Sequence, residues 1–203
     1  SDASGDIHKY CIDLSRVLSS KYGVKFRFNE KVKDINGTSF PIISTDKEDI
    51  PFDKVVICAG VKTQEFRNKF RDNFRIYPVK GYSITIDLDD EISKSAAPHV
   101  SIKDDHNKIV SSRLGNRLRV AGTAELAGEN KEVREERITP LIEWVNNCFP
   151  EVNTENIITW AGLRPMTSDM VPVMREYKRK NVFYNSGHGH LGWTMGAFAG
   201  KFI

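Results

Sequence analysis

The chain has 203 residues, of which 39% are hydrophobic and 28% charged, so it is long enough for about one to one and a half globular domains with a sizeable core. This composition excludes a small disulfide-stabilised protein, a collagen and a disordered chain. Thirty basic and 27 acidic side chains leave a net charge of only +3, which is spread evenly, so no nucleic-acid partner is expected.

The cysteines and the longest uncharged segment argue against a disulfide-bonded protein, a zinc protein and a membrane span. Cys11, Cys58 and Cys148 lie far apart without a C-x-x-C pair, so neither a disulfide framework nor a zinc site is indicated, and a reducing compartment is expected. The segment 181–200 lacks charged residues but contains five glycines and two histidines, which argues against a membrane span. The chain opens on Ser1 as though cut from something longer, so we expect a fragment.

The first part of the chain predicts a helix followed by strands. Asp6 is placed to cap a helix that ends near Gly23, and its apolar positions recur at spacings of three and four: Ile7, Cys11, Leu14 and Leu18. From Val24 the period changes to two, which predicts a strand over 24–28 and a hairpin at the Asn36-Gly37 turn.

The next segments predict a buried strand and a helix. The run 55–58 is continuously apolar, as in strands that are buried on both faces, and Ala59-Gly60 ends it. A helix is expected from Val61 to about Phe70.

The middle of the chain predicts an antiparallel sheet covered by a helix. Four alternating segments suggest strands, at 81–88, 99–103, 108–113 and 117–123. An amphipathic helix is expected from about Glu132 to Phe149, with Pro150 just beyond its end. The last part of the chain then gives a strand at 182–184, a glycine-rich turn and a helix that contains Leu191.

The turn matches the pattern G-x-G-x-x-G over 187–192, between a predicted strand and a predicted helix. A dinucleotide-binding fingerprint also needs a second parallel strand and an acidic residue about twenty positions later. This sequence stops at Ile203, so the pyrophosphate interpretation is disfavoured. Glycines nevertheless expose backbone N–H groups at the positive end of a helix, which favours a planar or anionic ligand at this turn. For Gly196 and Gly200, close packing of the helix on a sheet is an equal alternative.

Arg164 lies at the end of a strand-like run, immediately before Pro165. Its planar guanidinium could hold a carboxylate through two parallel hydrogen bonds, although the residues alone favour a surface or ion-paired arginine. Tyr82 is either the wall of a cleft or a strand aromatic. His188 and His190 without a third ligand make a poor metal site, and the absence of a G-x-S-x-G elbow ranks hydrolases low.

Four phrases in order resemble the FAD-dependent D-amino acid oxidase superfamily. They are Ser4-Gly5-Asp6 with His8-Lys9, Val55-Val56-Ile57-Cys58-Ala59-Gly60, Gly162-Leu163-Arg164-Pro165-Met166-Thr167, and Gly187-His188-Gly189 through Leu191-Gly192-Trp193-Thr194. Together with the run 78–83, they are most similar to the small subunit of the D-amino acid dehydrogenases. The resemblance implies α/β architecture plus an antiparallel sheet, comprising part of a Rossmann-like FAD domain without its N-terminal βαβ unit and a substrate domain of antiparallel strands covered by helices. The implied FAD-binding part is 1–72 with 166–203, and the substrate-binding part is 73–165.

The resemblance also assigns roles to residues. It implies FAD as the cofactor, with Val32 near the adenine, the edge Ala59-Gly60 beside the cofactor, and a turn and helix start under the isoalloxazine ring. That last group comprises Gly187, His188, Gly189, His190, Leu191, Gly192, Trp193 and Thr194. Arg164 would grip the substrate carboxylate, with His190 and Tyr82 beside the substrate; His190 stands where this subgroup is expected to have Thr.

The implied reaction is the oxidative deamination of D-amino acids to 2-oxo acids and ammonia, by transfer of the alpha hydrogen as hydride to flavin N5. It needs no catalytic acid or base from the protein, because positioning supplies the rate. The resemblance implies a quinone or the respiratory chain as the electron acceptor. We expect a cytoplasmic protein, with peripheral association with the inner membrane left open. The fragment alone is expected to be inactive. The alternatives are a glycine- or sarcosine-type amine oxidase and a non-catalytic flavoprotein-like binding module.

Overall fold

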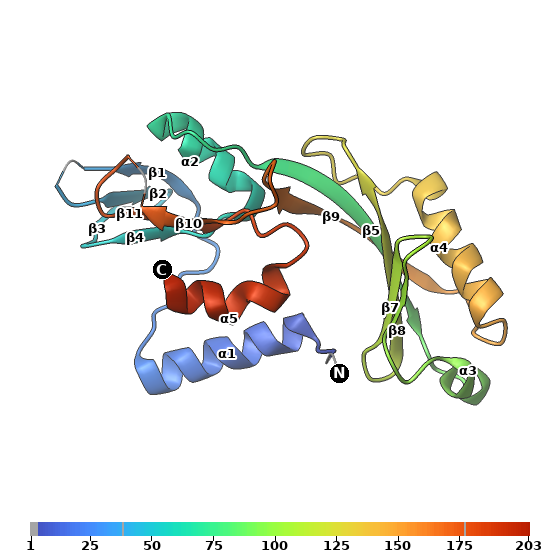
Figure 1. The fold of residues 1–203 in the computed structure, drawn as a ribbon. Coiled ribbons are helices and arrows are strands. Elements are labelled where there is room, and N and C mark those ends of the chain that lie inside the picture. Colours follow the sequence, from blue (N-terminus) through green and yellow to red (C-terminus); the bar gives the residue numbers. More distant parts are fainter. Residues whose placement is uncertain (1–3, 38, 177) are drawn as a thin grey trace. The chain divides into compact units, whose positions relative to one another are not determined.

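The computed structural model describes residues 4–37, 39–176 and 178–203, and these form two compact units (Figure 1). Unit 1 contains Val79–Leu163 together with the N-terminal segment up to Ile7, and unit 2 contains His8–Pro78 and Arg164–Ile203. The expected division at 72/73 and 165/166 assigned a cofactor role and a substrate role to the two parts, and that assignment stays a prediction.

Unit 1 is built on a five-stranded sheet with the order β6-β7-β8-β5-β9. Its strands are β5 (Tyr77–Asp87), β6 (Ile102–Asp104), β7 (Ile109–Arg113), β8 (Arg117–Glu125) and β9 (Ile157–Met166). The neighbouring pairs β6·β7, β7·β8 and β5·β8 are antiparallel. The expected antiparallel sheet is therefore confirmed, although β5 begins four residues earlier and β6 three residues later than the alternation suggested.

Two helices accompany this sheet, α3 (Glu91–Ala96) and α4 (Glu135–Cys148), and α4 lies along one face of it (Figure 1). Alternate residues of β5 point toward α4 because side chains in a strand alternate between its faces. Thus Ile84 and Ile86 share a buried cluster with Leu141 and Val145 of the helix. The predicted helix that covers the sheet is confirmed, whereas α3, which Asp90 caps by accepting from the Ser93 amide, was not predicted.

A buried charged group interrupts this apolar core. The Lys80 side chain is fully buried and its ammonium lies 3.4 Å from the Glu125 carboxylate. Glu125 also accepts a hydrogen bond from the hydroxyl of Tyr82, which is only 1% exposed, and pairs with Arg134 at 2.8 Å. Lys80 donates a further bond to the Glu132 carbonyl, so the group ties the segment before α4 to the sheet. We refer to Lys80, Tyr82 and Glu125, together with the exposed Arg134 at their edge, as the buried charge cluster.

Unit 2 contains two three-stranded sheets that share a core. One has the order β10-β11-β4 and is formed by β4 (Val55–Ile57), β10 (Val173–Glu176) and β11 (Val182–Ser186). The other is the antiparallel meander of β1 (Val32–Asn36), β2 (Ile42–Thr45) and β3 (Asp49–Pro51). Ile35 of the meander joins Ile57 and Tyr184 in one buried cluster, so the two sheets pack against each other.

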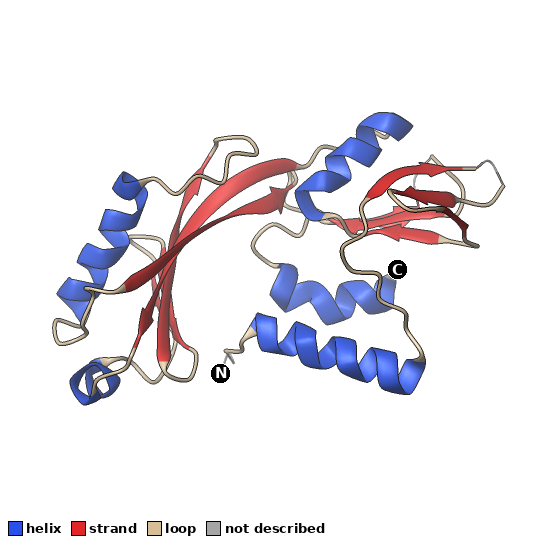
Figure 2. Ribbon diagram, turned by 180° about the vertical axis from the view of Figure 1, so that it is seen from behind, coloured by secondary structure: helices blue, strands red, loops and turns tan. Residues whose placement is uncertain are grey.

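The helices of unit 2 are α1 (Ile7–Tyr22), the 3-10 turn η1 (Gly60–Lys62) with α2 (Thr63–Phe70), and α5 (Gly192–Phe202). They confirm the three helices expected in these segments, except that α5 begins one residue after Leu191, which the prediction placed inside the helix. Helices α1 and α5 lie side by side in both views (Figures 1 and 2), and the rings of Tyr10 and Trp193 meet edge to face with centroids 5.1 Å apart. Helix α1 buries none of its residues within the described parts of the chain, and no helix there is long and apolar enough to cross a membrane.

Two expectations about unit 2 are wrong, and one alternative is not supported. The alternating segment 24–28 is not a strand; Phe26 and Phe28 instead stack on each other with centroids 5.6 Å apart. Strand β4 is buried on one face only, because Val56 is 44% exposed. Close packing of α5 through its small residues is not seen, since a Cβ on Gly196 or Gly200 would meet no atom of the described chain within 4 Å.

Candidate functional site

The candidate site of unit 2 lies at the carboxyl ends of two parallel strands. Strands β4 and β11 pair in parallel, with Val55 opposite Val182 and Ile57 opposite Tyr184. Each strand then runs into a bend with a left-handed glycine, Gly60 (φ 56°) or Gly187 (φ 81°), and each bend leads into a helix. Ligands of α/β proteins bind at such carboxyl ends, because two loops and two helix N-termini meet there.

Buried hydroxyl groups join these two bends. Thr63, the first residue of α2, is fully buried and donates from its hydroxyl to the Ser186 hydroxyl at 3.0 Å. Ser186, the last residue of β11, in turn donates to the carbonyl of Gly60 at 3.2 Å. The two loops at this edge are therefore coupled by a directed chain of hydrogen bonds.

The glycine turn after β11 packs tightly on the end of β9. The Gly189 amide donates to the Pro165 carbonyl at 2.9 Å, and His188 forms a β-bridge with Met166. A Cβ on Gly189 would lie 2.4 Å from the Met166 sulfur, and one on Gly187 would lie 2.8 Å from a methyl of Thr167. Both glycines have a positive φ, which favours glycine at each position. At Gly187 the close approach to Thr167 adds to this requirement, whereas at Gly189 a side chain would require the Met166 side chain to turn aside.

His188 sits at the centre of this turn. Its side chain is half-buried, and Nε2 is fully buried without a hydrogen-bond partner among the described residues. Burial lowers the pKa of the His188 imidazole, which favours the neutral ring at pH 7. A buried nitrogen without a hydrogen-bond partner lowers the stability of the folded protein. A ligand that supplies a hydrogen-bonding atom to the His188 Nε2 would remove this cost.

The residues after His188 are accessible. Those at 190–194, including His190 and Trp193, are exposed, and α5 begins after Leu191 without a side-chain hydrogen bond at its N-terminus. The first N–H groups of an α-helix have no partner within the helix, and they carry a partial positive charge. This end of the turn can accept an electron-rich or planar group.

The remaining predicted residues fall in different places. Arg164 is half-buried at the start of unit 2, immediately before Pro165, whose carbonyl holds the glycine turn. Val32 begins β1 and is 41% exposed, and no described contact ties it to the two bends. Tyr82 belongs to unit 1, where it lies in the core and bonds to Glu125, which favours its interpretation as a strand aromatic.

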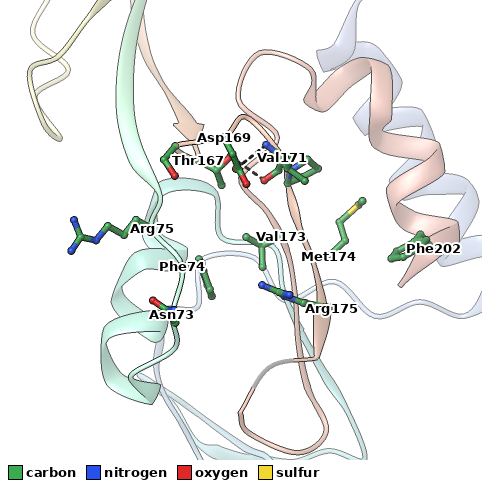
Figure 3. Close-up of a pocket in the computed structure, with 12 residues that line it drawn as sticks. Asn73, Phe74, Arg75, Thr167, Asp169, Val171, Val173, Met174, Arg175 and Phe202 are labelled. Carbon is green, nitrogen blue, oxygen red and sulfur yellow. Dashed lines mark hydrogen bonds between the residues drawn. The ribbon is translucent and has the colours of Figure 1, made fainter.

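A pocket of about 490 Å³ lies elsewhere in unit 2, and sequence reasoning missed it (Figure 3). Its walls combine the segments 73–75 and 167–175 with Phe202. Asp169 accepts from the Val171 amide and Thr167 donates to the Val171 carbonyl, so these polar side chains hold the loop itself. Because the walls come from three distant segments without a shared motif, no sequence signal could have indicated the pocket. None of the predicted site residues lines it.

Comparison with known proteins identifies relatives along the whole chain. The model of the family described as FAD dependent oxidoreductase matches residues 1–203. D-amino acid dehydrogenase 3 of Mesorhizobium japonicum is 49% identical over 97% of this chain and 49% of its own length. D-amino acid dehydrogenase of Vibrio vulnificus is 36% identical over the full chain and 48% of its own length. The chain thus spans about half the length of the curated relatives it matches.

Solved structures share the fold. Glycine oxidase from Bacillus cereus superposes with a TM-score of 0.72 at 24% identity, over 85% of this chain and 48% of its own. L-proline dehydrogenase from P. horikoshii gives a TM-score of 0.74 at 17% identity, over 88% of this chain and 49% of its own. These matches confirm the expected mixed α/β architecture with an antiparallel sheet.

Proposed function

Because the chain belongs to the family of FAD dependent oxidoreductases, we propose that it forms part of a D-amino acid dehydrogenase and contributes one wall of the flavin site. The observation that carries the proposal is the edge where β4 and β11 end, with two glycine bends joined by buried hydroxyls. The relatives named D-amino acid dehydrogenase support the substrate class.

The described residues at this edge fit FAD, the cofactor of the family. A Cβ on Gly60 would meet nothing within 4 Å, so the backbone there is open to a flat ligand. The buried Nε2 of His188 lacks a partner among the described residues, and a flavin carbonyl or ring nitrogen offers polar atoms of the required kind. We assign Ala59, Gly60 and the run from Gly187 to Thr194 to the cofactor, with Val32 as a backbone contact toward the adenine.

Bound FAD would supply the two-electron acceptor for oxidation of the amine carbon. The start of α5 would place its partial positive charge beside electron density that develops on reduction. Neutral His188 adds no charge of its own and can either donate or accept one hydrogen bond. The chain thus contributes electrostatics and orientation, and no proton transfer by a side chain is required.

Arg164 is proposed to bind the substrate carboxylate. A guanidinium presents two parallel N–H donors to a carboxylate, which fixes both the position and the tilt of the amino acid. Its place next to Pro165 supports this role, because Pro165 has a restricted φ and its carbonyl is tied to Gly189. His190, which is exposed, is proposed to lie beside the substrate. A quinone or another respiratory-chain component is the proposed electron acceptor.

Replacement of Arg164 by Lys is expected to lower kcat/KM for D-alanine by about tenfold or more, because the ammonium cannot reproduce the two-pronged contact. The measurement is dye-coupled oxidation of D-alanine by the purified holoprotein, expressed from its complete reading frame. Arg16→Lys is the matched control, since Arg16 is a 74% exposed arginine of the same unit and lies outside both the proposed site and the pocket.

Unchanged kinetics in Arg164→Lys would remove this residue from the substrate site. The same assay with sarcosine, and with oxygen in place of the dye, separates a dehydrogenase of D-amino acids from an amine oxidase of the same family. Absence of a flavin absorption band from the purified protein would contradict the proposal altogether and leave a non-catalytic binding module.

A further inference from the structure

We propose that Thr63 and Ser186 are positioning residues for the flavin, acting through the backbone of the two glycine bends without touching the cofactor. The inference rests on the proposed function and deepens it, because it names residues that no motif of the chain indicates. Thr63 lies at the start of α2 and Ser186 at the end of β11, and their hydroxyls meet 3.0 Å apart.

The two side chains are too deeply buried to reach a ligand. Thr63 has no exposed surface and Ser186 is 3% exposed. Buried hydroxyl groups need partners, and a hydroxyl that finds them in the backbone of a loop fixes that loop. We therefore assign Thr63 and Ser186 the role of fixing the backbone groups to which they are hydrogen-bonded.

What the pair holds is the carbonyl of Gly60. This oxygen accepts from the Ser186 hydroxyl at 3.2 Å and also from the Thr63 backbone amide. Gly60 has a φ of 56°, and a Cβ there would meet open space, so neither side-chain packing nor crowding determines the orientation of this peptide. The hydrogen bonds to the Gly60 carbonyl therefore determine the orientation of this peptide group in the bend.

The same pair also controls the start of the second bend. Ser186 directly precedes Gly187, which is buried against Thr167, and the turn then passes through His188 to the exposed residues that we assign to the flavin. Rotation of the Ser186 hydroxyl away from Gly60 would uncouple the ends of β4 and β11. The expected consequence is a looser and differently polarised flavin environment, with the fold of unit 2 retained through its apolar core.

The test compares Ser186→Ala and Thr63→Val, each of which removes one hydroxyl at nearly constant shape, in the holoprotein. Thr63→Val removes one buried hydrogen bond and Ser186→Ala removes two. We expect the FAD dissociation constant to rise about tenfold or more in each, together with a changed flavin absorption envelope and reduction potential. In the double variant the loss should not multiply, because the two hydroxyls act in series. Thr63→Ser keeps the donor and should restore wild-type values.

Ser111→Ala is the matched control, because Ser111 is a fully buried serine of unit 1 whose hydroxyl makes no hydrogen bond within the described residues. It should leave FAD affinity, spectrum and potential unchanged. If Ser186→Ala and Thr63→Val lower only the melting temperature and leave all three flavin properties at wild-type values, the pair is merely structural and the inference is wrong. Lack of flavin in the wild-type protein would instead overturn the proposed function, and the inference with it.

Discussion

Gly189→Val is expected to abolish flavin retention. The backbone at Gly189 has a φ of 56°, which a β-branched residue adopts only under strain, and even a single Cβ would lie 2.4 Å from the Met166 sulfur. The Met166 side chain must turn aside to relieve the clash, and the backbone strain at Gly189 favours a shift of the turn that weakens the bond from the Gly189 amide to the Pro165 carbonyl. The residues that follow would then lose the orientation that the proposed site needs. Flavin absorbance per mole of purified protein measures the effect.

The matched control is Gly115→Val. Gly115 also has a positive φ, of 65°, but a Cβ there meets no atom within 4 Å, and it lies in an exposed turn of unit 1. Gly115→Val therefore introduces a comparable backbone strain, but its side chain has no neighbouring atom like Met166 to displace. Flavin content near wild type in Gly189→Val, or equal losses in both variants, would show that the glycine turn does not shape the cofactor site.

The second large effect concerns stability. Lys80→Met is expected to lower the melting temperature by about 10 °C, because it leaves the Glu125 carboxylate in the core without its buried cation and frees the Glu132 carbonyl. The control is Lys103→Met in the same unit, which removes an ion pair with Asp105 whose side chains are about 70% exposed. That variant should melt within a few degrees of wild type. An equal fall in the melting temperature of both variants would show that the effect of Lys80→Met does not come from the burial of its charge.

The buried charge cluster also predicts a pH dependence. The Tyr82 hydroxyl, followed by Arg134 and Lys80, lowers the pKa of Glu125 to about 2 from the ordinary 4.5. A depressed pKa means that the folded state favours the charged form, so the stabilisation is complete above about pH 4.5 and is lost as the pH falls toward 2. Glu125→Gln should lose stability at neutral pH and flatten the acid limb of a melting-temperature profile between these values. An acid limb as steep as that of the wild-type protein would assign the pH dependence to other carboxylates.

Regular periodicity made much of the fold predictable. The helix of residues 7–22 and the helix that covers the sheet of unit 1 follow from apolar spacing and were correctly expected. The segment 24–28 shows why alternation alone is insufficient: a strand needs a partner for its backbone, and here Phe26 and Phe28 find each other instead. The short strands β2, β3 and β10 carry too few residues for a period to be recognised.

The candidate site was predictable only where its residues form a local motif. Gly187 and Gly189 were identified from spacing, and the structure explains them by positive φ and close approach. The hydroxyl pair of Thr63 and Ser186 could not have been found, because its members are 123 positions apart and neither belongs to a pattern. Tyr82 illustrates the reverse case, since a conspicuous aromatic in a motif-like run lies in the core.

The interrupted course of the chain bears on the order of assembly during synthesis. Nearly all of unit 1 is one continuous stretch, Val79–Leu163, whereas the pairing of Val55 with Val182 in unit 2 must wait until that whole stretch has left the ribosome. Contacts between neighbouring segments form sooner than those that close long loops. The inserted unit is therefore expected to mature first on the nascent polypeptide, while the residues of the β4 edge stay without their parallel partner until translation reaches the last strand.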